Sequence, residues 1–424
     1  MSPKTFLKIL IVIAIVVLIA LVIWFFFFSA PQGTTNGLRG NSDGFSPLNT
    51  GTIGGVSGNT QNQGGNNSTS TGNVSGYTNP IPVLRLLSDT PIGGYTASTT
   101  GTTTLIRWID RGRGNILEAK SNTLDISTLS NTLLPRVYTS SWNKAATAFI
   151  GATLESGATT PYYIYTEIRA VDGTSTANFA PFQLKGKRLP DNTIASATSP
   201  DRSRIFFLVK NTNGGSTGYT ANFDGSKVNQ IFTTPLTQLN VEWPSDNIIS
   251  ITTKGSASQQ GFMYFVNAKT GIWNKILGPL NGLSTRTSHD GKNVIYSVTG
   301  NNKDMVTSLY NVAKAASTDA VIKTLADKCV WGNYYKDLVY CGVPFQITPG
   351  TYPDAWYDGT ISTVDKIWQV NATTGETKLA AQLIGQAGRI LDIFTLGLDD
   401  KDNFLLFMNK YDLSFWSLDL VRSK

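Results

Sequence analysis

A three-segment pattern of β-strand type recurs along most of this sequence and restricts the possible folds more than any other feature. Residues 193–225 show it most clearly: a segment of small residues, a Ser-Pro-Asp turn, an apolar segment, a loop rich in Gly and Asn, and a third segment that ends at Asp224-Gly225. No long amphipathic helical pattern lies between the copies, which disfavours folds that alternate strands and helices. Repetition of one small sheet unit predicts a fold that stacks such units in series.

The pattern can be aligned seven times, and a fourth segment follows each of the first six copies. The first segments are residues 93–98, 136–142, 193–199, 239–245, 283–289, 327–333 and 388–394. The chain ends soon after residues 415–420, whereas residues 82–89 have the character of the missing fourth segment. Pairing of residues 83–87 with residues 415–420 would close a ring and remove exposed sheet edges. We therefore expect an all-β fold, a seven-bladed β-propeller over residues 81–424, with six blades as the alternative if the first copy is not a true blade.

The N-terminal region predicts a membrane anchor. Residues 9–28, from Ile9 to Phe28, form an unbroken apolar run, and a helix of this length at ~1.5 Å per residue spans about 30 Å, one hydrocarbon core. Lys4 and Lys8 precede the run, which keeps residues 1–8 in the cytoplasm and everything after the run outside. A cleaved signal peptide is the alternative, but Phe28 would occupy a position before the cleavage site where a small residue is required. We expect an uncleaved, single-pass signal anchor in the cell membrane.

The composition after the anchor changes twice. Residues 29–80 consist almost wholly of Gly, Asn, Ser, Thr and Gln, so they cannot bury enough apolar surface to offset chain entropy, and we expect a disordered linker. The propeller region follows. Only 15% of the whole chain is charged, and its net charge of +7 includes no basic cluster, which argues against nucleic acid as a partner.

The turns between the first two segments carry a family resemblance. Residues 199–201 read Ser-Pro-Asp, and related turns lie at residues 243–246 and 288–291. These turns resemble the W-S-P-D-G signature of TolB-like, WD-repeat-like β-propellers, and the resemblance extends over about residues 81–420. It implies the fold but no single function, because this family includes scaffolds, receptors and hydrolase gates. The order of anchor, linker and propeller also resembles uncharacterised membrane-anchored surface proteins of the bacterial cell envelope.

The two cysteines of the chain, Cys329 and Cys341, lie in the first and second segments of the sixth copy. If a tight turn joins these segments, the two residues face each other directly, at a separation that suits a disulfide. An extracytoplasmic location permits oxidation. We expect a disulfide, with two buried thiols as the alternative, and no metal site because no histidine lies nearby.

The longest departure from the repeat is residues 342–362, which we call the insert. It contains Tyr352, Trp356 and Tyr357 beside Asp354 and Asp358. Aromatic side chains next to carboxylates suit a glycan-binding face or a protein-binding hot spot. The alternative is a loop that folds back and buries its own aromatic side chains.

A second candidate binding segment lies in the first copy. Arg111 and Arg113 belong to a loop that we expect to neighbour the insert across one rim of the ring. There they could pair with a carboxylate of the insert, receive an anionic ligand, or belong to a solvated turn.

No convincing catalytic set is visible. The only histidine, His289, occupies a turn position, and no G-x-S-x-G motif is present, so a serine hydrolase triad is not expected. We expect a protein without a cofactor or metal that is not an enzyme and serves as a protein- or glycan-binding or scaffolding module outside the membrane. The alternatives are a cell-envelope hydrolase acting on glycan or peptide, with a carboxylate of the insert as acid or base, and a structural component of an envelope or appendage assembly.

Overall fold

The computed structural model describes residues 80–155, 160–170 and 181–423, and this part of the chain is built almost entirely of β-strands. None of the helices among these residues is long and apolar enough to cross a membrane. The predicted stub and anchor, residues 1–28, and the predicted linker up to residue 79 lie outside the described residues.

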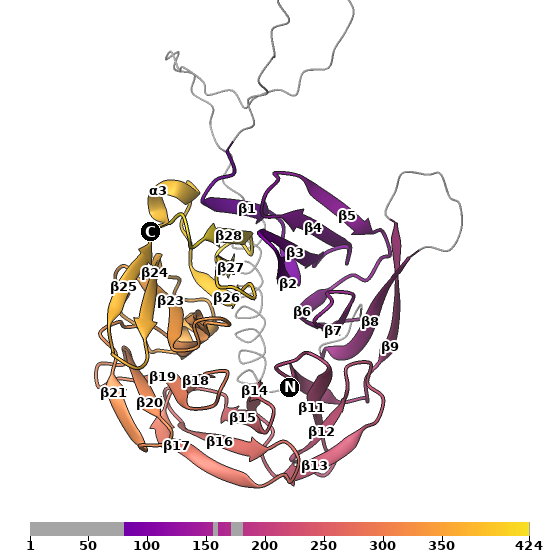
Figure 1. Ribbon diagram of the computed structural model, residues 1–424. Coiled ribbons are helices and arrows are strands. Elements are labelled where there is room, and N and C mark those ends of the chain that lie inside the picture. The colour runs from indigo at the N-terminus through magenta and orange to yellow at the C-terminus, as the bar shows by residue number, and fades with distance from the viewer. Residues whose placement is uncertain (1–79, 156–159, 171–180, 424) are drawn as a thin grey trace, which may run out of the picture. The chain divides into compact units, whose positions relative to one another are not determined.

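Five of the sheets have four strands each, and they stand around a common centre in a propeller arrangement (Figure 1). Their strands, in sheet order, are β10 (Thr193–Thr198), β11 (Arg204–Lys210), β12 (Ser216–Asn222) and β13 (Asn229–Thr234); β14 (Leu239–Ser245), β15 (Ile248–Thr253), β16 (Gln260–Asn267) and β17 (Trp273–Asn281); β18 (Ser284–Thr287), β19 (Asn293–Thr299), β20 (Met305–Asn311) and β21 (Ala316–Asp319); β22 (Cys329–Trp331), β23 (Leu338–Pro344), β24 (Asp365–Asn371) and β25 (Thr377–Ala381); and β1 (Leu84–Ser88), β28 (Phe415–Asp419), β27 (Phe404–Asn409) and β26 (Ile393–Leu398).

The remaining strands form one eight-stranded sheet. Its two ends are four-stranded antiparallel units, and they meet through a single parallel pair, Ser130 with Phe182. The strands, in sheet order, are β2 (Ile92–Thr100), β3 (Thr103–Asp110), β4 (Ile116–Lys120), β5 (Ile126–Ser130), β9 (Phe182–Arg188), β8 (Tyr162–Ala170), β7 (Ala148–Thr153) and β6 (Val137–Trp142). Three short helical segments accompany the strands: η1 (Ala326–Lys328), α2 (Asp354–Tyr357) and α3 (Ile384–Ala387).

The predicted closure of the ring is confirmed. β1, near the start of the described chain, pairs with β28, near its end, with Leu84 opposite Leu418. This pairing completes a sheet whose other three strands come from the C-terminus. Closure covers the edge of β28, which would otherwise expose a row of unpaired backbone groups.

The hydrophobic core lies between neighbouring sheets. The second strand of most units is buried on both faces, as in β7, where every residue is buried, and β27, where all but the first are. Side chains of adjacent sheets pack together in these layers; one cluster, for example, joins Trp108 of β3 to Phe415 of β28. Apolar second segments therefore read as continuous hydrophobic runs in the sequence, because each strand is covered on both sides.

The predicted disulfide is also confirmed. Cys329 of β22 lies directly opposite Cys341 of β23, with Cα atoms 4.1 Å apart, and the two sulfur atoms are bonded. Antiparallel strands joined by a short turn bring such residues together without any help from distant parts of the fold.

Candidate functional site

The insert does not present an aromatic face. It comprises the end of β23 and most of the loop that leads to β24. Two of its aromatic side chains are buried: Tyr352 is 1% exposed and Trp356 is 4% exposed. Tyr352 packs against Met305 and Leu325, and its hydroxyl donates to the carbonyl of Thr348 at 3.0 Å. The expectation that both aromatic residues lie on a binding surface is therefore wrong, and the alternative of a loop that buries its own aromatic side chains holds for this pair.

The carboxylates of the insert serve the loop itself. Asp354 accepts hydrogen bonds from Ser256 Oγ at 2.9 Å and from the backbone N–H of Ala257 at 2.6 Å. Asp358 accepts from the backbone N–H and the hydroxyl of Thr360, and these bonds lower the pKa of Asp358. Asp354 thus ties the insert to the loop between β15 and β16, and Asp358 stabilises a turn.

A buried ion network fastens the insert to the ring. Lys328, 1% exposed, places Nζ 2.7 Å from Asp365 Oδ2 and 2.8 Å from Asp392 Oδ1, and both carboxylates are fully buried. Thr363 bridges the two aspartates: its hydroxyl lies 2.9 Å from Asp365 Oδ1 and 3.0 Å from Asp392 Oδ1. Burial raises the pKa of Asp365, Lys328 opposes that rise, and the second carboxylate adds to it. We call Lys328, Thr363, Asp365 and Asp392 the lysine network.

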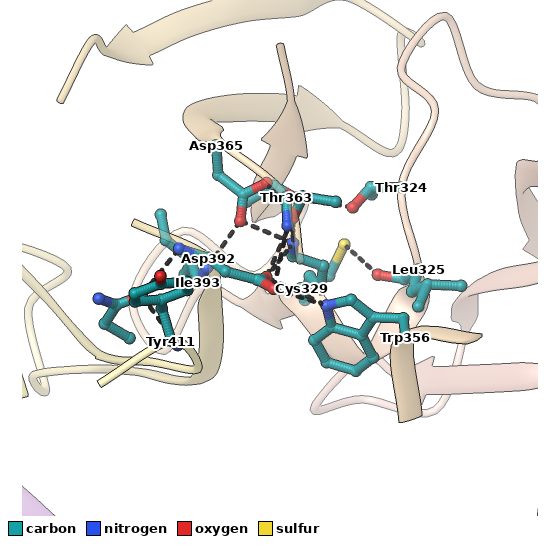
Figure 2. A network of polar contacts seen from close by, with 12 residues as sticks. Thr324, Leu325, Cys329, Trp356, Thr363, Asp365, Asp392, Ile393 and Tyr411 are labelled. Carbon is teal, nitrogen blue, oxygen red and sulfur yellow. Dashed lines mark hydrogen bonds and ion pairs between the residues drawn. The ribbon is translucent and has the colours of Figure 1, made fainter. Parts of the chain in front are cut away.

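Trp356 is the side chain that joins the insert to this network (Figure 2). Its indole Nε1 donates to both oxygens of Asp392, at 3.0 and 3.1 Å. Lys328 and Lys410 place their Nζ atoms 5.4 and 5.1 Å from the Trp356 ring centroid, within reach of cation–π attraction. Because the network is enclosed, it holds structure and offers no position for a ligand.

Open space lies instead along the first strands of the sheets, which face the middle of the ring. One cavity of about 370 Å³ runs between β2, β6 and β26, and we call it the arginine cavity. Arg111 and Arg202 reach it from different sheets, and its wall is rich in hydroxyl groups. No Asp or Glu among the described residues lines it. Its lining includes Tyr95, Thr96, Tyr138, Thr139, Ser140, Ser141, Trp142, Thr198, Phe394, Thr395 and Met408.

A second cavity of about 390 Å³ adjoins the first and shares residues 394–396 with it. We call it the Asp327 cavity. Asp327 Oδ2 accepts hydrogen bonds from Ser284 Oγ at 2.6 Å and from the hydroxyl of Tyr357 at 2.7 Å. Arg286 lies 3.0 Å from Glu242 Oε1 and 3.9 Å from Asp327 Oδ1, so its charge is balanced. Burial and the nearby Asp327 raise the pKa of Tyr357, which keeps its phenol protonated as a donor.

The segment shared by the two cavities is bulged. The pairing of β26 with β27 shifts register between Phe394 and Gly397. Within the bulge Thr395 has φ of 50°, a left-handed conformation that is costly for a β-branched residue. Tyr95 holds it there by donating its hydroxyl to the Thr395 carbonyl at 2.5 Å. Backbone strain of this kind is concentrated at ligand sites, where the surrounding fold maintains it.

The two arginines of the first copy, Arg111 and Arg113, lie in different surroundings. Arg111 lines the arginine cavity, where its Nε donates to the Ile92 carbonyl at 3.2 Å and its guanidinium lies 5.3 Å from the Tyr138 ring centroid. Arg113 is exposed and does not line that cavity. In the described parts of the chain neither is paired with Asp354 or Asp358, whose oxygens are engaged elsewhere, so pairing with the insert is not the one of the three alternatives that the structure forms.

The sequence analysis missed two sets of functional candidates. Arg202 was taken only as part of a turn that marks the fold, although it replaces the glycine of the family signature. Asp327 lines the second cavity and accepts a hydrogen bond from Tyr357, which is 30 residues away in the sequence. A charged residue where the signature has glycine was the one available signal; nothing in the pattern indicated the second pairing.

Comparison with known proteins supports the fold. No family model matches the chain, and no curated protein matches it. An oligogalacturonate lyase from Vibrio parahaemolyticus is 11% identical, with 79% of this chain and 90% of that chain covered and a TM-score of 0.50. TolB from Acinetobacter baumannii is 10% identical over 77% and 79% of the two chains, with a TM-score of 0.40. A puromycin-hydrolysing peptidase from Mycobacterium tuberculosis is 13% identical over 74% and 50%, with a TM-score of 0.45.

These comparisons correct one expectation. The prediction that the protein is not an enzyme is wrong as an inference from its fold, because the fold is shared with a solved lyase structure. At 10–13% identity the similarity assigns no activity to this chain. It establishes the architecture: the chain is a β-propeller, as its turn signatures predicted.

Proposed function

We propose that this chain is a membrane-anchored, extracytoplasmic β-propeller that binds a protein or glycan at the inner side of its ring. The observation that carries the proposal is the pair of adjoining cavities that meet at the strained Thr395 segment. The apolar run of residues 9–28, with Lys4 and Lys8 before it, supports the location.

We further propose that the ring has seven blades. In this interpretation the eight-stranded sheet is two blades, β2 to β5 and β6 to β9, each with the strand order of the four-stranded sheets. Among the described residues their strands share one backbone pair, Ser130 with Phe182, which is too little strand pairing to make them one blade. Both blades contribute their first strands to the arginine cavity, which places the proposed site where several rigid elements converge.

The binding proposal is tested by filling the arginine cavity in the full chain. Thr139 is exposed on β6 and lines the cavity, so Thr139→Trp should block it without disturbing the core. Thr128→Trp, on the exposed side of β5, introduces the same side chain away from the cavity. Crosslinking and pull-down from intact cells should recover a partner with the wild type and with T128W but not with T139W. Equal recovery with both variants would remove the cavity from the proposal.

The orientation has its own test. Alkaline phosphatase fused after Lys424 should be active if the propeller lies outside the membrane, because that enzyme matures only in an oxidising compartment. An inactive but full-length fusion would place the propeller on the cytoplasmic side.

A second candidate function is hydrolysis of a cell-envelope glycan or peptide. The Asp327 cavity favours it, since a carboxylate there is held by two hydroxyl groups and lies beside a guanidinium. Such a carboxylate could take up or release a proton next to a bound substrate. Incubation of the purified chain with cell-wall fragments, followed by mass spectrometry, should then give products that Asp327→Asn abolishes. Identical fragments with the wild type and with buffer alone would reject this candidate.

A further inference from the structure

We infer that the arginine cavity is built for a polyhydroxylated ligand, a saccharide or polyol, with two separate anionic groups, one held at Arg111 and one at Arg202. The inference rests on the proposed binding function and names the chemistry of its ligand. It follows from how the two arginines are bonded, how far apart they lie and what covers the wall between them.

The two guanidinium groups keep most of their donors unused. A guanidinium has five N–H donors. Arg85, elsewhere in the ring, engages the carbonyls of Lys120, Thr123 and Leu124. By contrast Arg111 donates once, to Ile92, and Arg202 donates once, to Thr96 Oγ1 at a long 3.4 Å. Neither has a carboxylate partner among the described residues, and burial lowers the pKa of Arg111. An anionic ligand would supply the missing acceptors.

Arg202 occupies a turn position that is left-handed in several of the sheets. Arg202 is the fourth residue of the Ser-Pro-Asp turn, closed by its N–H to the Ser199 carbonyl, and has φ of 55°. The equivalent position in the turn that begins at Ser288 is Gly291, with φ of 71°. Glycine adopts this conformation at no steric cost, whereas arginine adopts it only at a cost in free energy. Ala146 and Asp402 adopt φ of 54° and 56° at the same turn position, so this turn accepts residues other than glycine. Of these three residues, Arg202 is the one that lines the cavity.

The spacing of the two anchoring positions favours an extended ligand. The partners of the arginines, Ile92 and Thr96, are four residues apart on β2. At ~3.3 Å per residue, less the shortening of the bulge in this strand, that is roughly 10–13 Å. The two guanidinium groups are anchored at opposite ends of this span, which favours an extended ligand over a single carboxylate or phosphate.

The wall between the arginines favours sugars over peptides. It presents the hydroxyl groups of Thr96, Thr139, Ser140, Ser141, Thr198 and Thr395. Each hydroxyl is both a donor and an acceptor, which complements the hydroxyl groups of a saccharide or polyol. A peptide is more commonly held by apolar pockets and added strand pairing.

The test is calorimetric titration of the full chain with four probes. A hyaluronan tetrasaccharide carries carboxylates on alternate sugars, chitotetraose is its neutral counterpart, and a glycerol phosphate trimer carries phosphates. The peptide Asp-Gly-Gly-Asp, acetylated at its N-terminus and amidated at its C-terminus, carries two carboxylates without hydroxyl-rich rings. We expect the hyaluronan tetrasaccharide to bind and chitotetraose not to. Arg111→Gln and Arg202→Gln should each weaken binding about tenfold or more. Arg113→Gln, the same change outside the cavity, should have no effect.

Each outcome decides the inference. Binding of the glycerol phosphate trimer with the same dependence on the variants would support it with phosphate as the anion. Binding by the peptide alone, equal binding by chitotetraose, or an equal loss in R113Q would overturn it. If an arginine variant fails to fold, the wild type titrated at rising salt gives the answer, because contacts with two charges must weaken and a neutral site must not. If no probe binds while T139W still loses its cellular partner, the inferred ligand class is wrong and the proposed binding function is still supported.

Discussion

The lysine network and the arginine cavity differ in how their positive charges are neutralised. Lys328 is buried between two aspartates. Trp356 donates a further hydrogen bond to Asp392, and the hydroxyl of Thr363 donates one to Asp365. Arg111 and Arg202 border open space with no carboxylate from the described residues. The difference separates a charge that holds the fold together from a charge that is left available to a ligand. The insert, chosen for its aromatic residues, belongs to the first kind.

The largest effect should follow from removal of the buried cation. Lys328→Met leaves Asp365 and Asp392 enclosed without a counter-charge, which should lower the free energy of unfolding by about 3–5 kcal/mol. Urea denaturation of the full chain measures it. Lys314→Met, at an exposed turn, is the control and should change stability by less than about 0.5 kcal/mol. A small loss in K328M would mean that the network does not hold the insert.

The same variant has a pH signature. The pKa of Asp365 is raised in the folded state, so this group contributes stability at pH values below its unfolded pKa and loses it as the pH rises through the folded pKa. Without Lys328 that pKa rises further. The stability deficit of K328M should therefore be smaller near about pH 4 than at neutral pH. A deficit of equal size at both pH values would show that the carboxylates are not the cause.

The disulfide provides the next largest effect. Cys329 follows Lys328 directly, and its bond to Cys341 closes a short loop of sequence separation 12. Replacing both cysteines with alanine should cost about 2–3 kcal/mol. Thermal unfolding of C329A/C341A in the presence and absence of the K328M change would sharpen the comparison: additive losses would show that bond and network act independently.

The smallest effect should have the opposite sign. Arg202→Gly removes the left-handed strain of an arginine, so the fold should gain up to about 1 kcal/mol, while the titrated affinity for the anionic probe falls. Chemical denaturation and calorimetry on the same preparation measure both. A gain in stability without a loss of binding would leave the strain unexplained by the ligand.

Much of the fold could be predicted because its rules are local. Neighbouring residues determine the strand segments and their turns, and also the register that places Cys329 opposite Cys341. The count of segments alone predicted the pairing of β1 with β28. The site could not be predicted in the same way. Trp356 is hydrogen-bonded to Asp392, which is 36 residues further along the sequence. No short-range sequence pattern predicts that contact. Arg202 stands where the turn signature has glycine, but the turn around it was interpreted as a mark of the fold and not of function.

The seam between β1 and β28 has a mechanical consequence. β1 is the first strand after the N-terminal residues, and its hold on the ring includes the bond from the Asp419 N–H to the Val83 carbonyl and that from Arg422 Nη1 to the Ile81 carbonyl. Tension applied to the N-terminal part of the chain therefore reaches the ring first at these bonds. The strand that closes the ring is also the one at which a pulling force would begin to open it.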